Sequence, residues 1–243
     1  MAAARRPVVA ILAPMVSELR PVARAGKLRP STAVAGRGAY DGTIGGAEVF
    51  AALIGIGTEA AAAATAAILD ERVVDHVVVV GIAGGVGPAH GLGDLIAPAV
   101  VEDAASGLEF RPHPLGQTDR RCTGSLFTGD ELIRDTSRLA ELAARGVIGL
   151  DMETASVAAV CEARGMPWSV ERAISDLADD DHISEEVGAL ARPDGRPDGP
   201  AVARYLLRGP WRARHLARLG RQMQVAARVA AESAVAGIGR LAP

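Results

Sequence analysis

The sequence predicts a single α/β domain of three layers, in which helices cover both faces of a central mixed, mostly parallel sheet. Continuous apolar, β-branched runs are typical of strands buried on both faces. These runs alternate with alanine-rich helical segments, as in βαβ units. The 243 residues, 49% of them hydrophobic, are enough for one large core. Residues 1–243 are therefore expected to form one domain, in which 185–243 are a variable loop and a C-terminal helical extension.

Strands are predicted where apolar runs are bounded by glycine, proline or charged residues. The first run, Val8–Ala13, reads VVAILA and ends at Pro14. Residues 40–46 are rich in turn formers and predict an antiparallel hairpin. The remaining strands are expected, in chain order, at residues 48–54, 76–80, 94–101, 147–150 and 168–174.

Helices are predicted between these strands. Thr58, followed by a run of alanines, predicts a capped helix over residues 58–70. A stretch rich in proline, glycine and aspartate, 188–200, predicts a loop before a last helical region at 201–236, which a Gly-Pro pair interrupts. The other helices are expected at residues 17–25, 131–145 and 153–164.

The composition excludes several classes of protein. A net charge of −3 argues against general nucleic-acid binding. Cys122 and Cys161 fit neither a disulfide framework nor a zinc site, and the five histidines lack metal-ligand spacing, so no metal and no cofactor are expected. The first apolar run, of about seven residues, is too short to span a membrane and short for a signal peptide. We therefore expect a cytoplasmic protein.

Small or acidic residues follow five of the predicted strands. In sheets built from βαβ units, ligands bind beyond the carboxyl ends of the strands. Taken singly, each feature has an ordinary explanation, such as a tight turn, a solvated acid or a helix cap. Acids that follow three strands at the same end of the sheet, taken together, indicate a ligand-binding site. The residues concerned are Met15 and Glu18, Gly55-Ile56-Gly57, the loop Gly81-Ile82-Ala83-Gly84-Gly85, Asp151-Met152-Glu153, and Ser175-Asp176.

The motifs GIAGGVGPAHGLGDLI, GLDMETASVAAVC and ERAISDLADD, with ILAPMVSEL near the start, resemble the nucleoside phosphorylase and nucleosidase superfamily over residues 8–181. Within it, the chain is similar to methylthioadenosine/S-adenosylhomocysteine nucleosidases. The tail after Ser184 resembles hopanoid-associated members, which are implied to remove adenine from adenosylhopane. The resemblance implies a homodimer whose ligand is a small purine nucleoside.

This resemblance implies roles for individual residues. Asp176 would be the general acid that protonates purine N7, since adenine leaves poorly unless protonated, and burial would raise the pKa of its carboxyl. Ser175 would hold Asp176, and Glu18 would be the base that activates water. Glu153 would bind the ribose hydroxyls. The other residues expected to bind the substrate are Met15, Ile56, Ala83, Gly84, Leu132, Leu150, Asp151, Met152 and Arg172, with Leu132 in the wall of an open 5′ side.

The sequence favours water over phosphate as the nucleophile. Phosphorylases of the superfamily carry an arginine ahead of the glycine-rich loop, where this chain has VVVV, and Glu18 would repel phosphate. Ile82 and Asp151 depart from the usual serine and glutamate of nucleosidases, and a weak anion site at Arg20 and Arg172 stays open. A phosphate-dependent transferase and a non-catalytic nucleoside-binding protein therefore stay open as alternatives.

The tail has an unusual charge pattern. Seven arginines and no acid lie between Arg204 and Arg228. One interpretation is a last helix that packs on the sheet through Trp211, Leu216, Leu219 and Met223 and leaves a solvated basic face. The other is peripheral contact of residues 204–228 with an anionic membrane, at the inner face of the cell membrane, which fits a lipid-like substrate.

Overall fold

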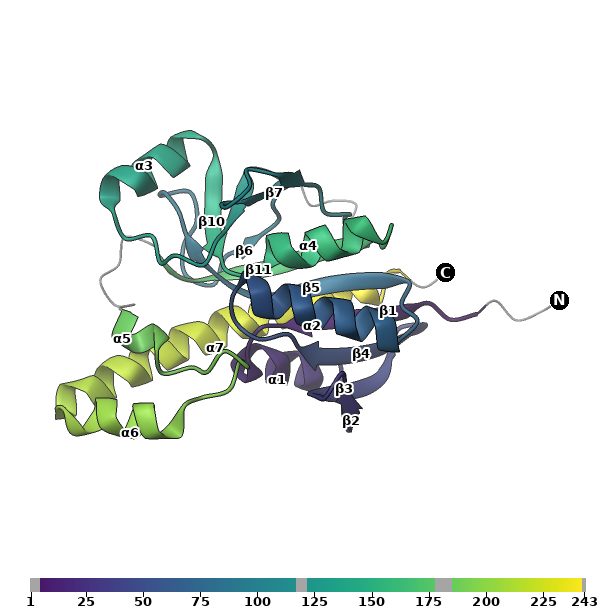
Figure 1. Cartoon of the computed structure of the whole chain (residues 1–243), viewed down its shortest axis with the longest axis horizontal. Helices are drawn as coiled ribbons and strands as arrows, with labels where there is room; N and C mark the ends of the chain where they lie inside the picture. Colours follow the sequence, from purple (N-terminus) through teal and green to yellow (C-terminus); the bar gives the residue numbers. More distant parts are fainter. Residues whose placement is uncertain (1–4, 117–121, 178–184, 242–243) are drawn as a thin grey trace.

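The computed structural model describes residues 5–116, 122–177 and 185–241. In these residues a mixed sheet of eleven strands lies between helices, as the sequence predicts (Figure 1). The strands are β1 (Val8–Ala13), β2 (Arg29–Val34), β3 (Arg37–Ile44), β4 (Ala47–Leu53), β5 (His76–Gly85), β6 (Leu95–Ile96), β7 (Val100–Asp103), β8 (Glu109–Phe110), β9 (Ser125–Thr128), β10 (Val147–Asp151) and β11 (Trp168–Leu177). The helices are α1 (Val16–Ala25), α2 (Thr58–Glu71), α3 (Thr136–Ala144), α4 (Thr154–Ala163), α5 (Glu185–Gly188), α6 (Gly199–Leu207) and α7 (Pro210–Ile238).

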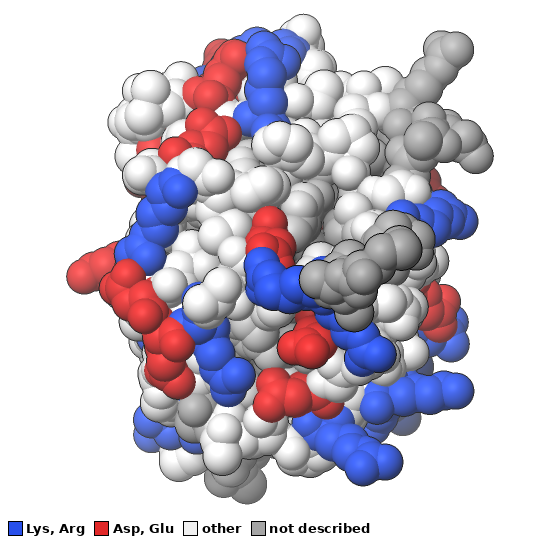
Figure 2. Space-filling view, turned by 90° about the vertical axis from the view of Figure 1, so that its right-hand side faces the viewer, with Lys and Arg blue, Asp and Glu red and all other residues white. Residues whose placement is uncertain are grey.

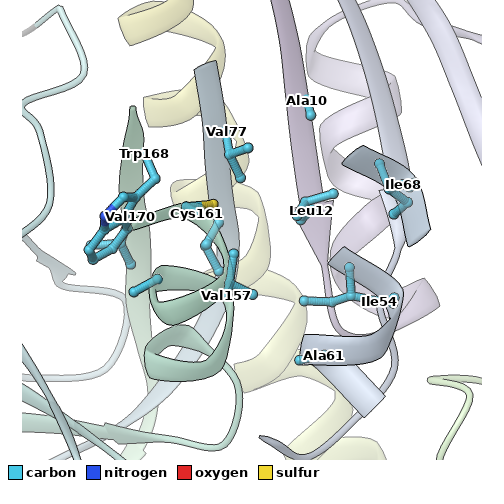
Figure 3. Packing of buried hydrophobic residues seen from close by; sticks show 14 of the residues in the cluster. Ala10, Leu12, Ile54, Ala61, Ile68, Val77, Val157, Cys161, Trp168 and Val170 are labelled. Atoms are coloured by element: carbon cyan, nitrogen blue, oxygen red, sulfur yellow. The ribbon is translucent and has the colours of Figure 1, made fainter. Parts of the chain in front are cut away.

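The central strands bury both faces. Alternate residues of a strand point to opposite sides, so Ala10 and Leu12 of β1 enter one core while Val9 and Ile11 enter the other. The first core lies under α2 and α4, and Figure 3 shows how Leu12 and its neighbours pack there. The second core lies under α1 and α7. These two cores make the three layers.

Strand β5 connects the two halves of the sheet. Its first half pairs with β1 in parallel, its last residues pair with β10 in antiparallel, and β11 runs parallel along its whole other edge. Residues 81–85 were expected to form a loop, and this is wrong, because they continue β5. Pairing with β11 as far as Leu177 supplies the hydrogen bonds that keep this glycine-rich segment extended.

Three other predictions fail at element ends. The cap of α2 is Gly57, with a φ of 91°, and Thr58 instead binds Asp130. The strand expected at 94–101 is two short strands, β6 and β7, with Pro98 between them. The helix expected from residue 131 begins only at Thr136, because the Asp135 side chain caps it there.

The C-terminal region has two parts. The second half of α7 packs in the core, while α6 and the first half of α7 project from the sheet (Figure 1). Ala226, Ala230 and Ala234 in the second half of α7 are buried against the sheet and α1. The first half of α7 extends beyond the sheet and is accompanied by α6 (Figure 1). Trp211 was expected in the packed face, but it is 60% exposed. In the part of the chain that the structure describes, no helix is both long and apolar enough to cross a membrane.

Candidate active site

Three acids from two parts of the chain surround Arg172 of β11. Its Nη2 lies 2.5 Å from Asp151 Oδ2 and 3.3 Å from Glu153 Oε2, and its Nη1 lies 3.6 Å from Glu18 Oε1. All four side chains are nearly inaccessible to solvent. A buried charge needs a partner, so these residues depend on one another. Burial by itself lowers the pKa of Arg172. The surrounding carboxylates, with Asp151 contributing most, outweigh this effect and raise the pKa above its ordinary value.

Glu18 joins the start of α1 to β5. Its Oε2 accepts a hydrogen bond from the backbone N–H of Met15 at 2.8 Å, and its Oε1 accepts one from Ile82 at 2.9 Å. Taken singly, Glu18 has the ordinary explanation of a solvated acid, but its side chain is 1% exposed. Burial raises the pKa of Glu18 to about 7 although Arg172 opposes this shift. A carboxyl that titrates near neutral pH is suited to act as a general base.

Glu153 lies at the N-terminal end of α4. Its Oε1 accepts a hydrogen bond from the backbone N–H of Gly57 at 3.1 Å, which joins the end of β4 to the cluster. Burial raises the pKa of Glu153 to about 8 against the opposing effect of Arg172. A raised pKa favours the neutral form of Glu153, which would reduce repulsion among the acids of the cluster.

Asp151 has both carboxylate oxygens occupied by protein groups. Thr128 Oγ1 donates to Oδ1 at 2.5 Å, while the Thr154 backbone N–H donates to Oδ2 at 3.1 Å, where Arg172 also binds. This geometry favours a positioning role over direct contact with a substrate. Neither threonine is among the residues expected from the sequence to form the site. The spacing of Thr154 from Asp151 is a helix-start pattern that could have revealed it, whereas Thr128 carries no such signal.

Asp176 lies farther along β11 and is partly exposed. The ladder between β5 and β11 has an irregularity at Ser175, and such bulges re-aim side chains. Ser175 Oγ donates to Asp176 Oδ1, and Asp176 Oδ2 lies close above Gly84. At about 3.3 Å per residue, Asp176 is roughly 13 Å from Arg172 along the strand. Arg172, which lies beside the predicted base Glu18, and the predicted acid Asp176 thus occupy separate places along β11.

The other predicted residues lie in β5, in β10 and in the connections that follow strands. Ala83 and Gly84 are in β5, and Leu150 pairs with Gly84 from β10. Leu132, in the segment between β9 and α3, is 48% exposed. Met15, Ile56 and Met152 are partly buried in the connections that follow β1, β4 and β10.

A groove, called here the α1–α7 groove, begins beside Glu18. Its volume is about 940 Å³, and α1, residues 187–197, α6 and α7 line it. Met15 belongs to its wall and also donates its N–H to Glu18. The structure does not favour the anion site left open at Arg20 and Arg172, because Arg20 lines this groove and Arg172 is bound by acids.

The chain is similar in sequence and in fold to known proteins. The chain matches the family model "Phosphorylase superfamily" over residues 8–119 and 115–192. A 5′-methylthioadenosine/S-adenosylhomocysteine nucleosidase from Exiguobacterium sp. is 29% identical over 181 residues, 63% of this chain and 78% of the relative. The structure of a nucleosidase of that name from Neisseria meningitidis, in complex with methylthio-immucillin-A, has a TM-score of 0.70 at 20% identity, covering 96% of this chain and 98% of its own. Futalosine hydrolase of Helicobacter pylori has a TM-score of 0.64 at 20% identity, covering 88% and 97%.

The family match covers the segments that contain the sequence motifs described above. The family match includes the strands and helices that hold the acidic cluster, and it ends before α6 and α7. The named relatives are nucleosidases, which are N-glycosyl hydrolases. The resemblance to the superfamily is thereby confirmed, while the likeness of the tail to hopanoid-associated members stays a prediction. The chain belongs to the phosphorylase superfamily.

Proposed function

We propose that this protein hydrolyses the bond between adenine and ribose in a 5′-substituted adenosine. Asp176, held by Ser175, donates a proton to N7 of the base. Glu18 removes a proton from the attacking water, and Glu153 binds the ribose hydroxyls. Carboxylates near the ribose also stabilise the positive charge that develops there as the bond breaks. The separation of Asp176 from Glu18 and Arg172 along the strand edge leaves room for a nucleoside between them.

The single observation that carries the choice of hydrolysis is the charge state around Arg172. A phosphate nucleophile needs free cationic donors. Here the Arg172 guanidinium is already bound by Asp151, Glu153 and Glu18, so a phosphate dianion would meet acids rather than a free cation. Water carries no charge and is not repelled by this cluster.

The α1–α7 groove supports a large apolar group at the 5′ position. Leu132, which was expected in the wall of the 5′ side, is not among the residues that line this groove. Its walls include Val16, Leu190, Leu219 and Met223, and it begins at Met15 beside the cluster. Such a groove offers little to ribose or adenine but can bury a hydrocarbon. Adenosylhopane is therefore a candidate substrate, methylthioadenosine and S-adenosylhomocysteine are the alternative, and the homodimer stays a prediction.

Adenine release from a series of adenosines tests this function. Methylthioadenosine, S-adenosylhomocysteine and 5′-alkylthioadenosines of increasing chain length would be compared with and without phosphate. We expect phosphate-independent release, and kcat/KM should rise roughly fourfold for each methylene that the groove buries, at about 0.8 kcal/mol each. Met223→Trp should reduce this gain, whereas Ala217→Trp, at an exposed position on the same helix, should not.

Each alternative has its own result in this assay. Phosphate-dependent formation of ribose 1-phosphate derivatives would identify a phosphorylase. Binding of adenine without turnover of any substrate would identify a nucleoside-binding protein. Equal kcat/KM along the alkyl series would remove the support for an apolar 5′ group and leave a methylthioadenosine-type nucleosidase.

Gly81 should be required for the contact between Glu18, the proposed catalytic base, and Arg172. A Cβ atom at this position would lie 2.3 Å from Glu18 Oε1 and 2.4 Å from Arg172 Nη1. Gly81→Ala should displace both groups and lower kcat/KM by about 100-fold, the effect expected of a misplacement near 1 Å. Gly38→Ala is the matched control, because a Cβ atom there meets nothing within 4 Å. Indistinguishable kinetics of the two variants would contradict the proposed geometry.

A further inference from the structure

The corner between α6 and α7 exposes several large apolar side chains. Leu206, Leu207 and Trp211 are 38%, 87% and 60% exposed. They lie close together in the sequence, at the end of the molecule opposite the two termini (Figure 1). Apolar side chains that gather on the surface in this way mark an interaction site, since burying them against a partner is favourable.

Two arginines near the corner are part of its internal structure. Arg208 and Arg212 both form ion pairs with Glu186, and the Arg212 pair has an Nη1–Oε2 distance of 2.8 Å. The Arg212 guanidinium also lies over the rings of Tyr205 and Trp211, at 4.5 Å and 4.9 Å from their centroids. These contacts hold α6 against α7 and keep the exposed indole in place.

Four further arginines of α6 and α7 contribute positive charge to this surface. Arg204, Arg214, Arg218 and Arg221 are exposed, and among the residues described by the structure none of them has an acidic partner. Three of them follow Trp211 along α7 at intervals that place them on its face of the helix. On the opposite end of the molecule, by contrast, basic and acidic side chains are interspersed (Figure 2).

We propose that this surface binds an anionic lipid bilayer. We call it the docking face, and it consists of Leu206, Leu207, Trp211, Arg204, Arg214, Arg218 and Arg221. The apolar side chains enter the headgroup region, where tryptophan is favoured, while the arginines bind lipid phosphates. A second copy of the chain is a poorer partner, because a two-fold contact through this face would bring the same arginines together.

The docking face continues into the α1–α7 groove. Arg221 lies in the groove wall, and Val225, one helical turn further on, is 46% exposed there. The groove extends from this edge to Met15 beside the catalytic cluster. If the substrate carries an apolar 5′ group, as proposed above, that group can pass from the bilayer to the site without crossing water. Binding of the bilayer does not itself depend on the enzymatic activity.

Tryptophan fluorescence and sedimentation with vesicles test this inference. The chain has two tryptophans, and since Trp168 is 1% exposed, a change in emission on adding vesicles reports on Trp211. At about 0.15 M salt, vesicles containing phosphatidylglycerol should shift the emission to the blue and carry the protein into the pellet. Vesicles of phosphatidylcholine alone should retain far less protein.

Two sets of variants separate the contributions of charge and apolar surface. The triple variant Arg214→Gln, Arg218→Gln and Arg221→Gln should weaken partitioning about 100-fold, at roughly fivefold for each arginine. Leu207→Ser should also weaken it, and its high exposure makes misfolding no explanation for the loss. The controls alter similar residues elsewhere and should bind as wild type: Arg111→Gln with Arg138→Gln, and Val73→Ser with Leu108→Ser.

Three outcomes would overturn the inference. The first is wild-type protein that stays in the supernatant with phosphatidylglycerol vesicles. The second is an equal loss of binding in the controls, which would show that binding does not depend on the docking face. The third is a dimer in sedimentation velocity that Leu207→Ser abolishes, since the face would then bind a second copy. None of these assays contains a nucleoside, so failure of the proposed activity would leave their results unchanged.

Discussion

Replacement of Asp176 by asparagine should lower kcat for adenine release by about 10²–10⁴-fold, the range that general acid catalysis contributes. The adenine anion is a poor leaving group, so the bond breaks readily only when N7 receives a proton. Asparagine has nearly the same shape as aspartate, and its carbonyl can still accept the hydrogen bond from Ser175. The loss would therefore report the missing proton rather than a collapsed site.

Adenine affinity provides the internal comparison for this variant. Asp176→Asn should change the Kd of adenine, measured by calorimetry, much less than it changes kcat, since only the transition state needs the transferred proton. Asp70→Asn is a suitable control, because Asp70 is an exposed acid of α2 that forms a surface ion pair with Arg164. Wild-type kcat in Asp176→Asn would rule out the proposed general acid.

Glu18→Gln should remove the base and lower kcat/KM for hydrolysis by a similar factor, about 10²–10⁴-fold. The base acts only when ionised, and burial raises its pKa to about 7. In the wild type, kcat/KM should therefore fall about tenfold for each pH unit below 7, because Glu18 becomes protonated. The residual activity of the variant should lack this dependence. A pH–rate profile of both proteins measures the effect.

The same substitution also affects the fold. Glutamine has one acceptor oxygen, so it cannot accept from both the Met15 and Ile82 N–H groups as Glu18 does. Leaving one of them unpaired costs about 1–3 kcal/mol, which thermal unfolding would reveal as a lower Tm. Glu59→Gln is the control, because Glu59 is an exposed acid in the first turn of α2.

Added phosphate tests the nucleophile in the same proteins. If phosphate restores activity to Glu18→Gln, the main role of this glutamate is to exclude phosphate. A wild-type rate that rises in proportion to phosphate would refute hydrolysis.

Much of the fold follows from local patterns. Val8–Ala13 is predicted at its observed bounds, because an unbroken β-branched run ended by Pro14 has no competing helical periodicity. The β5 strand is predicted from its observed start at His76, but only as far as residue 80, since glycines at 81, 84 and 85 indicate a turn when read alone. They remain extended only because β11 pairs with them, and that partner lies almost a hundred residues away in the chain.

The sequence by itself determined the α/β class, the order of most strands and helices, and the motifs that place the chain in its superfamily. These depend on residue type and short-range periodicity, which are properties of the chain before it folds. Only the tertiary structure decided that Glu18 is buried, that Arg172 is shared by three acids and that a groove starts at Met15. Such features depend on distance and on exclusion of water, and both arise only when remote segments meet.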